Sequence, residues 1–570
     1  MSEYGIKIKN FEASTVYECN LGVRKIPKTT KAMFSNSLFN DFLVKNGLKV
    51  TKSGATRDII CLEFKFGSRS YEEEIEHVEE MLSKADLTEE KRTSIEKIKE
   101  EVEINKDKYD KKTKEEIRDI YYKDGVTIEY VTYKKDGITE KKREKIHYKM
   151  LYRTPGKAKK GSCMFICDRL FKKAQKYIRM GIKLPKNNSP IVEIGAYSSL
   201  ITSSICGRVR INPKNILVVE DLDSFFETKV VSVETNENKQ CIAKTIDKYK
   251  LKNTMFDGQA LIDHSKFPEW GNGYILLRQH FCKMAAFDTY IQKFFMDYYG
   301  DDYLTATITD MFGVEHYVKD IELITTDNAM KWLKFNVSYD YWCDRVYEDG
   351  CMFGIVKTAH KSKLGDMQRM SYQMVNALDE SIMDKVIANS KEYIESMKAD
   401  DEVFLDYLRK NANFSNDFEV LVALCEQNPE FTRSEYFRDR KKRVIEAYTK
   451  NFKGGRLLQN GDNLVIVGSP YAMLLHAVGE SPDKDVTFEQ EEGTIQCYTS
   501  RFDDGNELAF FRSPFNSKNN MSYLHNHYHP YFDKYFNLGE QIIAVNMRNT
   551  DFQDRNNGLT YWVTLSQAYN

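Results

Sequence analysis

Hydrophobic and polar residues follow different periods in different parts of this chain. Residues 58–66 (DIICLEFKF) form an apolar run that predicts one buried strand. Between residues 70 and 120 the sequence becomes rich in Glu and Lys, and apolar positions such as Ile75 and Val78 recur near helical spacing. This stretch predicts two amphipathic helices. We interpret it as a solvated helical hairpin, with a charged binding arm as the alternative.

A hairpin and a basic segment follow. Residues 125–133 and 138–152 alternate around the dipeptide Asp136-Gly137, which favours a tight turn between two antiparallel strands. The segment 153–160 (RTPGKAKK) is short, basic and interrupted by Gly and Pro. Its composition suits a loop that contacts phosphates, and it suits equally an exposed loop that binds nothing.

The rest of the chain changes from strand to helix and back to strand. Residues 164–182 have a helical pattern, and residues 190–219 contain short β-branched runs. The sequence is rich in strands from there to residue 347, helical with few Gly or Pro over residues 370–450, and rich in short strands again over residues 455–570. We find no repeat in the sequence. The order predicts an α+β protein of several domains.

We divide the chain into five regions on this basis. They are an α+β region with a charged helical hairpin (1–150), a basic loop and connecting region (151–215), a first strand-rich module (216–369), a helical connector (370–452) and a second, incomplete strand-rich module (453–570).

Composition excludes some classes of protein. Of the 570 residues 41% are hydrophobic and 13% aromatic, so the chain can bury enough surface to fold. With 84 Lys and Arg against 85 Asp and Glu, nucleic acid would be bound only by local patches. No apolar run reaches the roughly 18 residues that a membrane span needs, and we expect a cytoplasmic protein without a membrane partner. The 11 cysteines include no C-x-x-C pair and are expected to be reduced thiols.

Two short acidic motifs are candidates for metal chemistry. The tetrad Tyr299-Gly300-Asp301-Asp302 matches the metal-binding hairpin of viral palm-type polymerases, but the preceding residues favour a helix that ends with Gly300 as its cap. Asp221 and Asp223 follow an apolar strand, where carboxylates often meet Mg²⁺. A polar exit from the strand is the alternative interpretation, because two carboxylates do not specify a metal site.

A longer series of motifs resembles, in the same order, the cellular RNA-dependent RNA polymerases of the RNA-silencing type. Seven segments of this chain are similar to elements of that family. They are Asp257-Gly258 (D-G), Arg278 with Lys283 (R-x-x-x-x-K-G), Phe287-Asp288 (F-D), Thr309-Asp310 with Gly313 (T-D-x-x-G), residues 325–334 (T-x-S-Q-x-K-x-W-K), Tyr372-Gln373-Met374 (Y-Q-M) and Arg512-Ser513-Pro514 (R-N-P). Each match is weak alone, and their order provides the specificity. The resemblance covers residues 216–557 and leaves the first two hundred residues unexplained.

The resemblance implies a fold and an activity. The fold would contain two double-psi β-barrel-like modules joined by a helical segment, with the active site between the barrels. The activity would be template-directed RNA synthesis from nucleoside triphosphates (NTPs) on an RNA or other single-stranded nucleic-acid template. Lys283 would contact the triphosphate, with Arg278 in support, and Arg512 would lie near the nucleotide sugar and the template.

The same resemblance implies Mg²⁺, which the family binds with the three carboxylates of a D-x-D-x-D loop. No D-x-D-x-D occurs in these 570 residues. Asp551 and Asp554 are near the expected place, although their spacing of three does not put both on one strand face. They are either partial substitutes, or the chain stops short of its metal loop and a partner chain would have to supply it. The alternative function is therefore a catalytically silent nucleic-acid-binding or scaffold protein.

Overall fold

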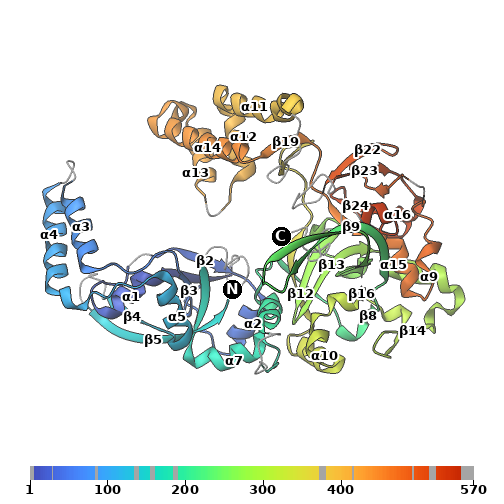
Figure 1. Cartoon of the computed structure of the whole chain (residues 1–570), viewed down its shortest axis with the longest axis horizontal. Helices are drawn as coiled ribbons and strands as arrows, with labels where there is room; N and C mark the ends of the chain where they lie inside the picture. Colours follow the sequence, from blue (N-terminus) through green and yellow to red (C-terminus); the bar gives the residue numbers. More distant parts are fainter. Residues whose placement is uncertain are drawn as a thin grey trace. The chain divides into compact units, whose positions relative to one another are not determined.

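The chain forms an α+β protein of several domains with mixed sheets (Figure 1). The structure, a computed structural model, describes residues 5–27, 30–83, 88–133, 140–153, 161–183, 191–371, 380–413, 416–490, 493–511 and 521–553. It divides into two compact units. Unit 1 contains Met1–Pro213, Leu277–Lys283 and Met330–Val356, and unit 2 contains Lys214–Leu276, Met284–Ala329 and Lys357–Asn570. Within the described ranges no helix is both long and apolar enough to cross a membrane.

Unit 1 is built on a six-stranded sheet. Its strand order is β2 (Ala32–Ser35), β1 (Ile6–Glu12), β3 (Ala55–Glu63), β6 (Ser162–Cys167), β5 (Glu140–Tyr152) and β4 (Val126–Tyr133). The β1–β3 pair is parallel and the other pairs are antiparallel. The predicted strand at residues 58–66 is confirmed as β3, and the predicted hairpin as β4 and β5. Its turn, Asp136-Gly137, lies outside the described residues, as do residues 154–160 of the basic loop.

Three segments of unit 1 differ from the prediction. The predicted helix at residues 164–182 begins only at Asp168, because Ser162–Cys167 is the buried strand β6. A short apolar run does not distinguish a buried strand from a buried helix. Residues Ile191–Ser198 are helix α8 and not a strand. Since β6 pairs with both β3 and β5, the region 151–215, predicted as a basic loop and connecting region, contributes a strand to the N-terminal sheet.

The charged segment forms the two predicted helices, α3 (Tyr71–Leu82) and α4 (Glu89–Ile104), which pack against each other. Ser70 and Glu73 form a capping box that fixes the start of α3. The remaining helices and strands of unit 1 are α1 (Ala13–Leu21), α2 (Leu38–Lys45), α5 (Lys114–Asp124), α7 (Asp168–Ile178), α10 (Tyr339–Glu348) and the antiparallel pair β7 (Gly207–Arg210) and β17 (Met352–Thr358).

A first module has four strands, which belong to unit 2 apart from Cys282 and Lys283: β8 (Ile216–Val219), β11 (Gln259–Asp263), β13 (Cys282–Thr289) and β16 (Leu323–Thr326). In chain order, the first strand runs parallel to the fourth, the fourth antiparallel to the second, and the second parallel to the third. Nearly every residue of β8, β11 and β16 is buried, which explains their continuous apolar sequences.

A second module repeats this topology with β20 (Val465–Gly468), β21 (Gln496–Tyr498), β23 (Met521–Asn526) and β24 (Ile542–Val545). Again the first strand is parallel to the fourth, the fourth antiparallel to the second, and the second parallel to the third. An extra strand, β22 (Glu507–Phe511), pairs with β23. The chain therefore uses one four-strand topology twice, although its sequence shows no repeat.

Helices lie between the two modules in sequence. They are α11 (Met383–Ala399), α12 (Asp401–Asn411), α13 (Phe418–Gln427) and α14 (Glu435–Lys453), and they share a small apolar core of their own. The helical prediction for residues 370–450 is confirmed for these elements, and Tyr372-Gln373-Met374 lies outside the described residues. The strands β18 (Met367–Ser371) and β19 (Arg456–Asn460) pair with each other at the two ends of this region.

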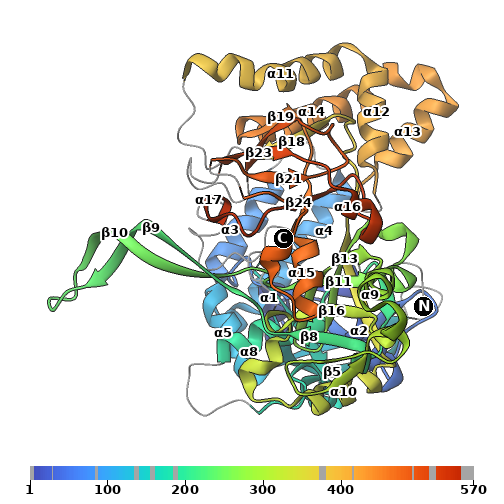
Figure 2. The same ribbon diagram turned by 90° about the vertical axis from the view of Figure 1, so that its right-hand side faces the viewer.

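The remaining elements of unit 2 are short, with one exception. The short ones are β12 (Tyr274–Gln279), α9 (Ile291–Tyr299), β14 (Thr307–Thr309), β15 (Glu315–Tyr317), α15 (Pro470–Ala477), α16 (Pro530–Tyr535) and α17 (Thr550–Gln553). The exception is a long two-stranded hairpin of β9 (Asp223–Thr235) and β10 (Cys241–Thr254), inserted between the first and second strands of the first module. Figure 2 shows this hairpin projecting from the rest of its unit.

Candidate functional site between the two strand modules

The two modules of unit 2 are joined through the side chain of Gln259, the first residue of β11. Its Nε2 donates to the carbonyl of Gly468 (2.9 Å), and its Oε1 accepts from the Gly468 amide (2.8 Å). Gln259 is 1% exposed, so neither of its polar groups has water as an alternative partner. This pair of hydrogen bonds links the second strand of the first module to the first strand of the second.

The backbone around Gly468 is crowded and strained. A Cβ atom at Gly468 would lie 2.3 Å from the Met547 Cγ, so only glycine fits there. The next residue, Ser469, has a left-handed backbone (φ 33°) that non-glycine residues seldom adopt. Its Oγ accepts from the amide of Met547 (2.9 Å), which helps to hold this conformation. Strain of this kind is typical of functional turns.

Asp288, from the F-D motif, makes a second link between the modules. Its buried carboxylate accepts from Asn537 Nδ2 (2.7 Å) and contacts His264 Nδ1 (3.0 Å). Burial raises the pKa of Asp288, and the hydrogen bonds from Asn537 and His264 lower it in part. The main chain is paired as well, since the amide of Asn537 donates to the Asp288 carbonyl (3.0 Å). Asp288 therefore positions the segment before β24.

Asp221 braces the loops of the first module rather than forming an open metal site. Its carboxylate accepts from the amides of Leu222 (2.8 Å) and Phe256 (3.0 Å) and from Asn328 Nδ2 (2.9 Å). These donors come from the ends of three different segments, so one side chain holds them together. Its neighbour Asp223 is exposed and forms an ion pair with Lys252 (2.6 Å). The interpretation of Asp221 and Asp223 as a polar exit from the strand accounts for both residues.

Burial raises the pKa of Asp221 from an ordinary 3.8 to about 6, and its hydrogen-bond donors limit the rise. Between about pH 4 and 6 the unfolded chain has therefore lost a proton that the folded protein keeps. The folded protein loses stability as the pH rises through this window. We expect the Tm of wild type to fall relative to that of Asp221→Asn between pH 4.5 and pH 7, measured by thermal unfolding. A Tm difference that is the same at both pH values, as expected for the exposed control Asp301→Asn, would contradict this.

Asp310, from the T-D-x-x-G motif, shapes the turn between β14 and β15. Its Oδ1 accepts from the amides of Phe312 and Val314 (2.8 Å each), and its Oδ2 contacts His316 Nε2 (3.1 Å). Gly313 has φ 77°, a conformation that favours glycine. The motif residues therefore specify a turn.

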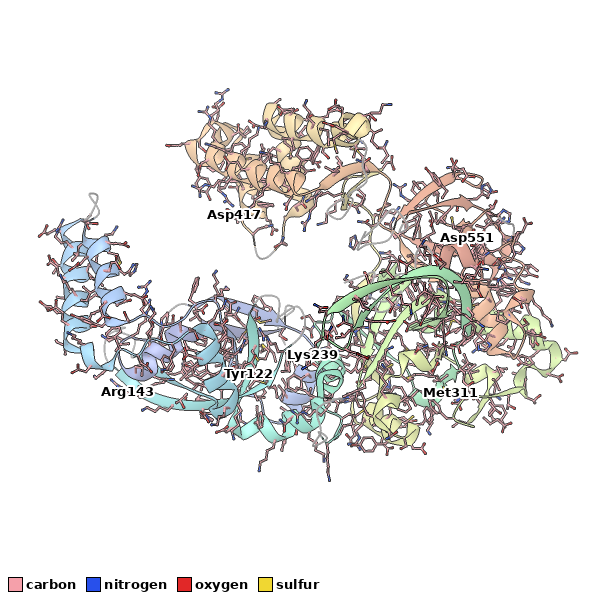
Figure 3. All side chains as sticks on the ribbon, in the orientation of Figure 1. Tyr122, Arg143, Lys239, Met311, Asp417 and Asp551 are labelled. Atoms are coloured by element: carbon pink, nitrogen blue, oxygen red, sulfur yellow. The ribbon has the colours of Figure 1, made fainter. Side chains whose placement is uncertain are left out.

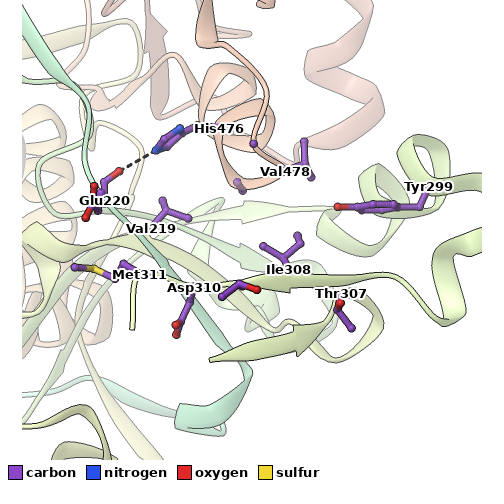
Figure 4. A pocket seen from close by; sticks show the side chains of 12 residues that line it. Val219, Glu220, Tyr299, Thr307, Ile308, Asp310, Met311, His476 and Val478 are labelled. Carbon is purple, nitrogen blue, oxygen red and sulfur yellow. Dashed lines mark hydrogen bonds between the residues drawn. The ribbon is translucent and has the colours of Figure 1, made fainter. Parts of the chain in front are cut away.

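This turn forms one side of an open groove of about 400 Å³ (Figure 4). The other side is the end of α15, where His476 Nε2 donates to the carbonyl of Glu220 (2.8 Å). The lining contains no Lys or Arg. The groove is therefore unsuited to a triphosphate, and we do not assign it to the nucleotide.

The two predicted phosphate-binding cations of the first module lie on neighbouring strands. Arg278 is near the end of β12, and Lys283 is the second residue of β13. Arg278 is 6% exposed, and its Nη1 donates to the carbonyl of Leu277 (3.0 Å). Lys283 is partly exposed. Of the two, Lys283 is thus the cation that a triphosphate from solvent can reach.

The structure describes only some of the residues predicted for the second module. Asp551 lies exposed in the first turn of α17 and is labelled in Figure 3. Arg512 and Asp554 lie outside the described residues. Among the residues that the structure describes, no group of three or more His, Cys, Asp or Glu side chains is arranged to hold a metal ion. Asp551 alone does not fit a two-metal Mg²⁺ site, so we derive no chemical step through the metal.

The palm-type interpretation of Tyr299-Gly300-Asp301-Asp302 is wrong. Tyr299 ends helix α9, and Gly300 follows it with φ 55° as the cap that the sequence favoured. Asp301 and Asp302 are exposed in a short 3₁₀ turn. A pair of carboxylates held on a tight β-hairpin is therefore not formed here.

Sequence reasoning missed several residues that join the modules. Gln259 and Asp288 stood inside quoted motifs, but no role was assigned to either. Gly468 carried a usable signal, because a glycine that ends a buried strand and precedes Ser-Pro marks a tight turn or a close backbone approach. His264 and Asn537 carried none, since each is a polar residue in a loop whose partner is distant in sequence.

No protein-family model matches the chain, and no curated protein matches its sequence.

Proposed function

We propose that this chain carries the core of a template-directed RNA polymerase of the two-barrel class, a nucleotidyltransferase that uses NTPs and Mg²⁺. The observation that carries the proposal is the doubled strand topology of unit 2. Two modules with the same order of parallel and antiparallel pairs, separated in sequence by a helical region, are what the two double-psi barrels of that class require. The double-psi identity of these modules is part of the proposal.

The order of the motifs on these modules supports the same assignment. Asp257-Gly258 precedes β11, Lys283 is the second residue of β13, and Phe287-Asp288 lies just before the end of β13. The D-G and F-D elements adjoin Gln259 and include Asp288, the two side chains that join the modules. A motif that lies where two barrels meet is in the position expected of an active site between them.

The proposed reaction extends RNA by one nucleotide. The 3′ hydroxyl of the RNA attacks the α-phosphorus of the NTP, the bond to the β-phosphate oxygen breaks, pyrophosphate leaves, and the hydroxyl proton passes to solvent. Lys283 would hold the triphosphate as a point charge, and Arg512 would hold the sugar or template through its guanidinium group. The resemblance implies Mg²⁺ at Asp551 and Asp554, and the proposed reaction includes no step on that metal.

A second candidate is a catalytically silent protein that binds single-stranded nucleic acid with the same modules. The missing D-x-D-x-D favours it, because adjacent carboxylates in that motif hold the metals of this class. A partner chain that supplies such a loop would restore the polymerase.

The test is incorporation of labelled nucleotide. Purified protein with a single-stranded template, all four NTPs and Mg²⁺ is expected to extend labelled RNA, and omission of the template is expected to abolish extension. Asp301→Asn is expected to leave extension unchanged, because Asp301 is an exposed residue after a helix. Binding of the template without any extension would favour the silent protein instead.

A further inference from the structure

The hairpin of β9 and β10, which we name the arm, is unusual because both of its faces are exposed to solvent. Its tip half has no buried residue, and large apolar side chains such as Val231 (64%) and Val233 (69%) are exposed. A two-stranded hairpin of this kind is marginally stable alone. The arm is an insertion in the first module, and the second module has helix α15 at the corresponding place. This difference indicates that the arm has a use outside the folded core.

The base of the arm is fixed to the segment where the resemblance places the metal-binding residues. Ser224 Oγ donates to Gln553 Oε1 (2.6 Å), and Gln553 is the last residue of α17, the helix that carries Asp551. The amide of Met255 donates to the Leu222 carbonyl (2.9 Å) and closes the base of the hairpin. The arm therefore leads away from the proposed site of synthesis.

Positive charge is concentrated on one strand of the arm. Strand β10 carries four lysines, Lys244, Lys248, Lys250 and Lys252, and one acidic residue, Asp247. Lys250 and Lys252 occupy alternate positions of the regular ladder, so they lie on one face about 6.8 Å apart, and Lys248 lies within the register shift between Ile246 and Tyr249. All four lysines are exposed. A row of cations on one strand face suits the repeating phosphates of a nucleic-acid backbone.

An exposed aromatic ring lies on the same face as these lysines. Phe225 is 50% exposed and stands opposite Lys252 in the β9–β10 register, and the Lys250 Nζ lies 4.7 Å from the centre of its ring. An aromatic ring beside cations is the combination with which proteins bind single strands, because bases stack on the ring while lysines contact the phosphates.

We propose that the basal half of the arm binds the sugar-phosphate backbone of single-stranded nucleic acid that enters or leaves the polymerase site, through Lys248, Lys250 and Lys252, with base stacking on Phe225. The binding itself is inferred from the arm alone. The link to a polymerase site rests on the proposed function. Charge on β10 favours nucleic acid over protein as the ligand of this half, since the strand contributes three lysines against Asp247 there, and Asp223 and Glu227 of β9 offset part of that charge.

The test is binding of a fluorescent single-stranded oligonucleotide, measured by anisotropy over a series of salt concentrations. The triple variant Lys248→Ala, Lys250→Ala, Lys252→Ala is expected to bind at least about tenfold more weakly. Its slope of log K against log salt is expected to be smaller by about 2, since each lost phosphate contact on a single strand contributes about 0.7. The corresponding triple Arg variant is expected to keep the wild-type slope.

A triple Ala variant at Lys91, Lys97 and Lys108 is the control, because it removes the same charge from the N-terminal charged segment. The variant Phe225→Ala is expected to weaken oligonucleotide binding without changing the salt slope. Unchanged affinity and slope in the β10 variant would overturn the proposal. Such a result together with a change of oligomeric state in Val231→Glu, Val233→Glu would make the arm a protein contact instead. If wild type binds the oligonucleotide but incorporates no nucleotide, the proposed polymerase function is contradicted, and the proposal that the arm binds nucleic acid is not.

Discussion

Replacing Lys283 with Ala is expected to lower kcat/KM for nucleotide incorporation about 100-fold. Lys283 is the partly exposed cation of the ordered motif series, and a triphosphate that loses a positioned positive charge loses the stabilisation of both bound substrate and transition state. A decrease of this size corresponds to about 2.7 kcal/mol. Binding of a fluorescent NTP is expected to weaken as well, by at least about tenfold, and this can be measured without turnover.

Two matched variants separate charge from folding at this position. Lys283→Arg keeps the charge and is expected to retain part of the NTP affinity, since a guanidinium group is not equivalent to an ammonium group on phosphate. Lys266→Ala removes a lysine that is ion-paired with Glu322 (3.0 Å) and is expected to leave NTP binding unchanged. Equal NTP affinities for wild type and Lys283→Ala would remove Lys283 from the site.

Gln259→Ala is expected to cause the largest loss of stability of any change at the junction of the modules. It removes a bidentate hydrogen bond and leaves the buried amide and carbonyl of Gly468 without their partner, at a cost of about 2–4 kcal/mol. Because the protein has several domains, hydrogen exchange is a better measure than one global unfolding curve. The amides of β11 and β20 are expected to exchange faster in the variant.

Gln240→Ala is the control for this change, because Gln240 is an exposed glutamine in the turn of the arm. It is expected to leave exchange in both modules unchanged. If the β20 amides are as protected from exchange in Gln259→Ala as in wild type, the account of the junction is contradicted, because the protection of Gly468 would not depend on Gln259.

The sequence predicted those elements whose cause is local. The spacing of apolar residues gave α3 and α4, the apolar run at residues 58–66 gave β3, and Gly300 gave the end of α9. Each depends on periodicity or on one special backbone position, and both can be read along the chain. The strand β6 was missed because six buried apolar residues fit either kind of element.

What the sequence did not predict depends on contacts between distant residues. The doubled topology of unit 2 was expected only through the resemblance, because corresponding strands, such as Ile216–Val219 and Val465–Gly468, share only a buried apolar character. The contact of Gln259 with Gly468 joins residues 209 apart in sequence, so no local pattern indicates it. The candidate site, inferred from the order of its motifs, stays a prediction. The structure adds that Asp221 and Asp310 hold loops of the first module and that Gln259 and Asp288 join the two modules.

The most direct test of the central claim, a polymerase built from the two modules of unit 2, is whether the template dictates the product. Protein is given Mg²⁺, a primed single-stranded oligo(U) template and each labelled NTP in turn. The account predicts that AMP alone is incorporated, that a template of oligo(C) directs GMP instead, and that Lys283→Ala reduces both. Incorporation that ignores the template, or none by wild type under conditions in which it binds both template and NTP, would contradict it.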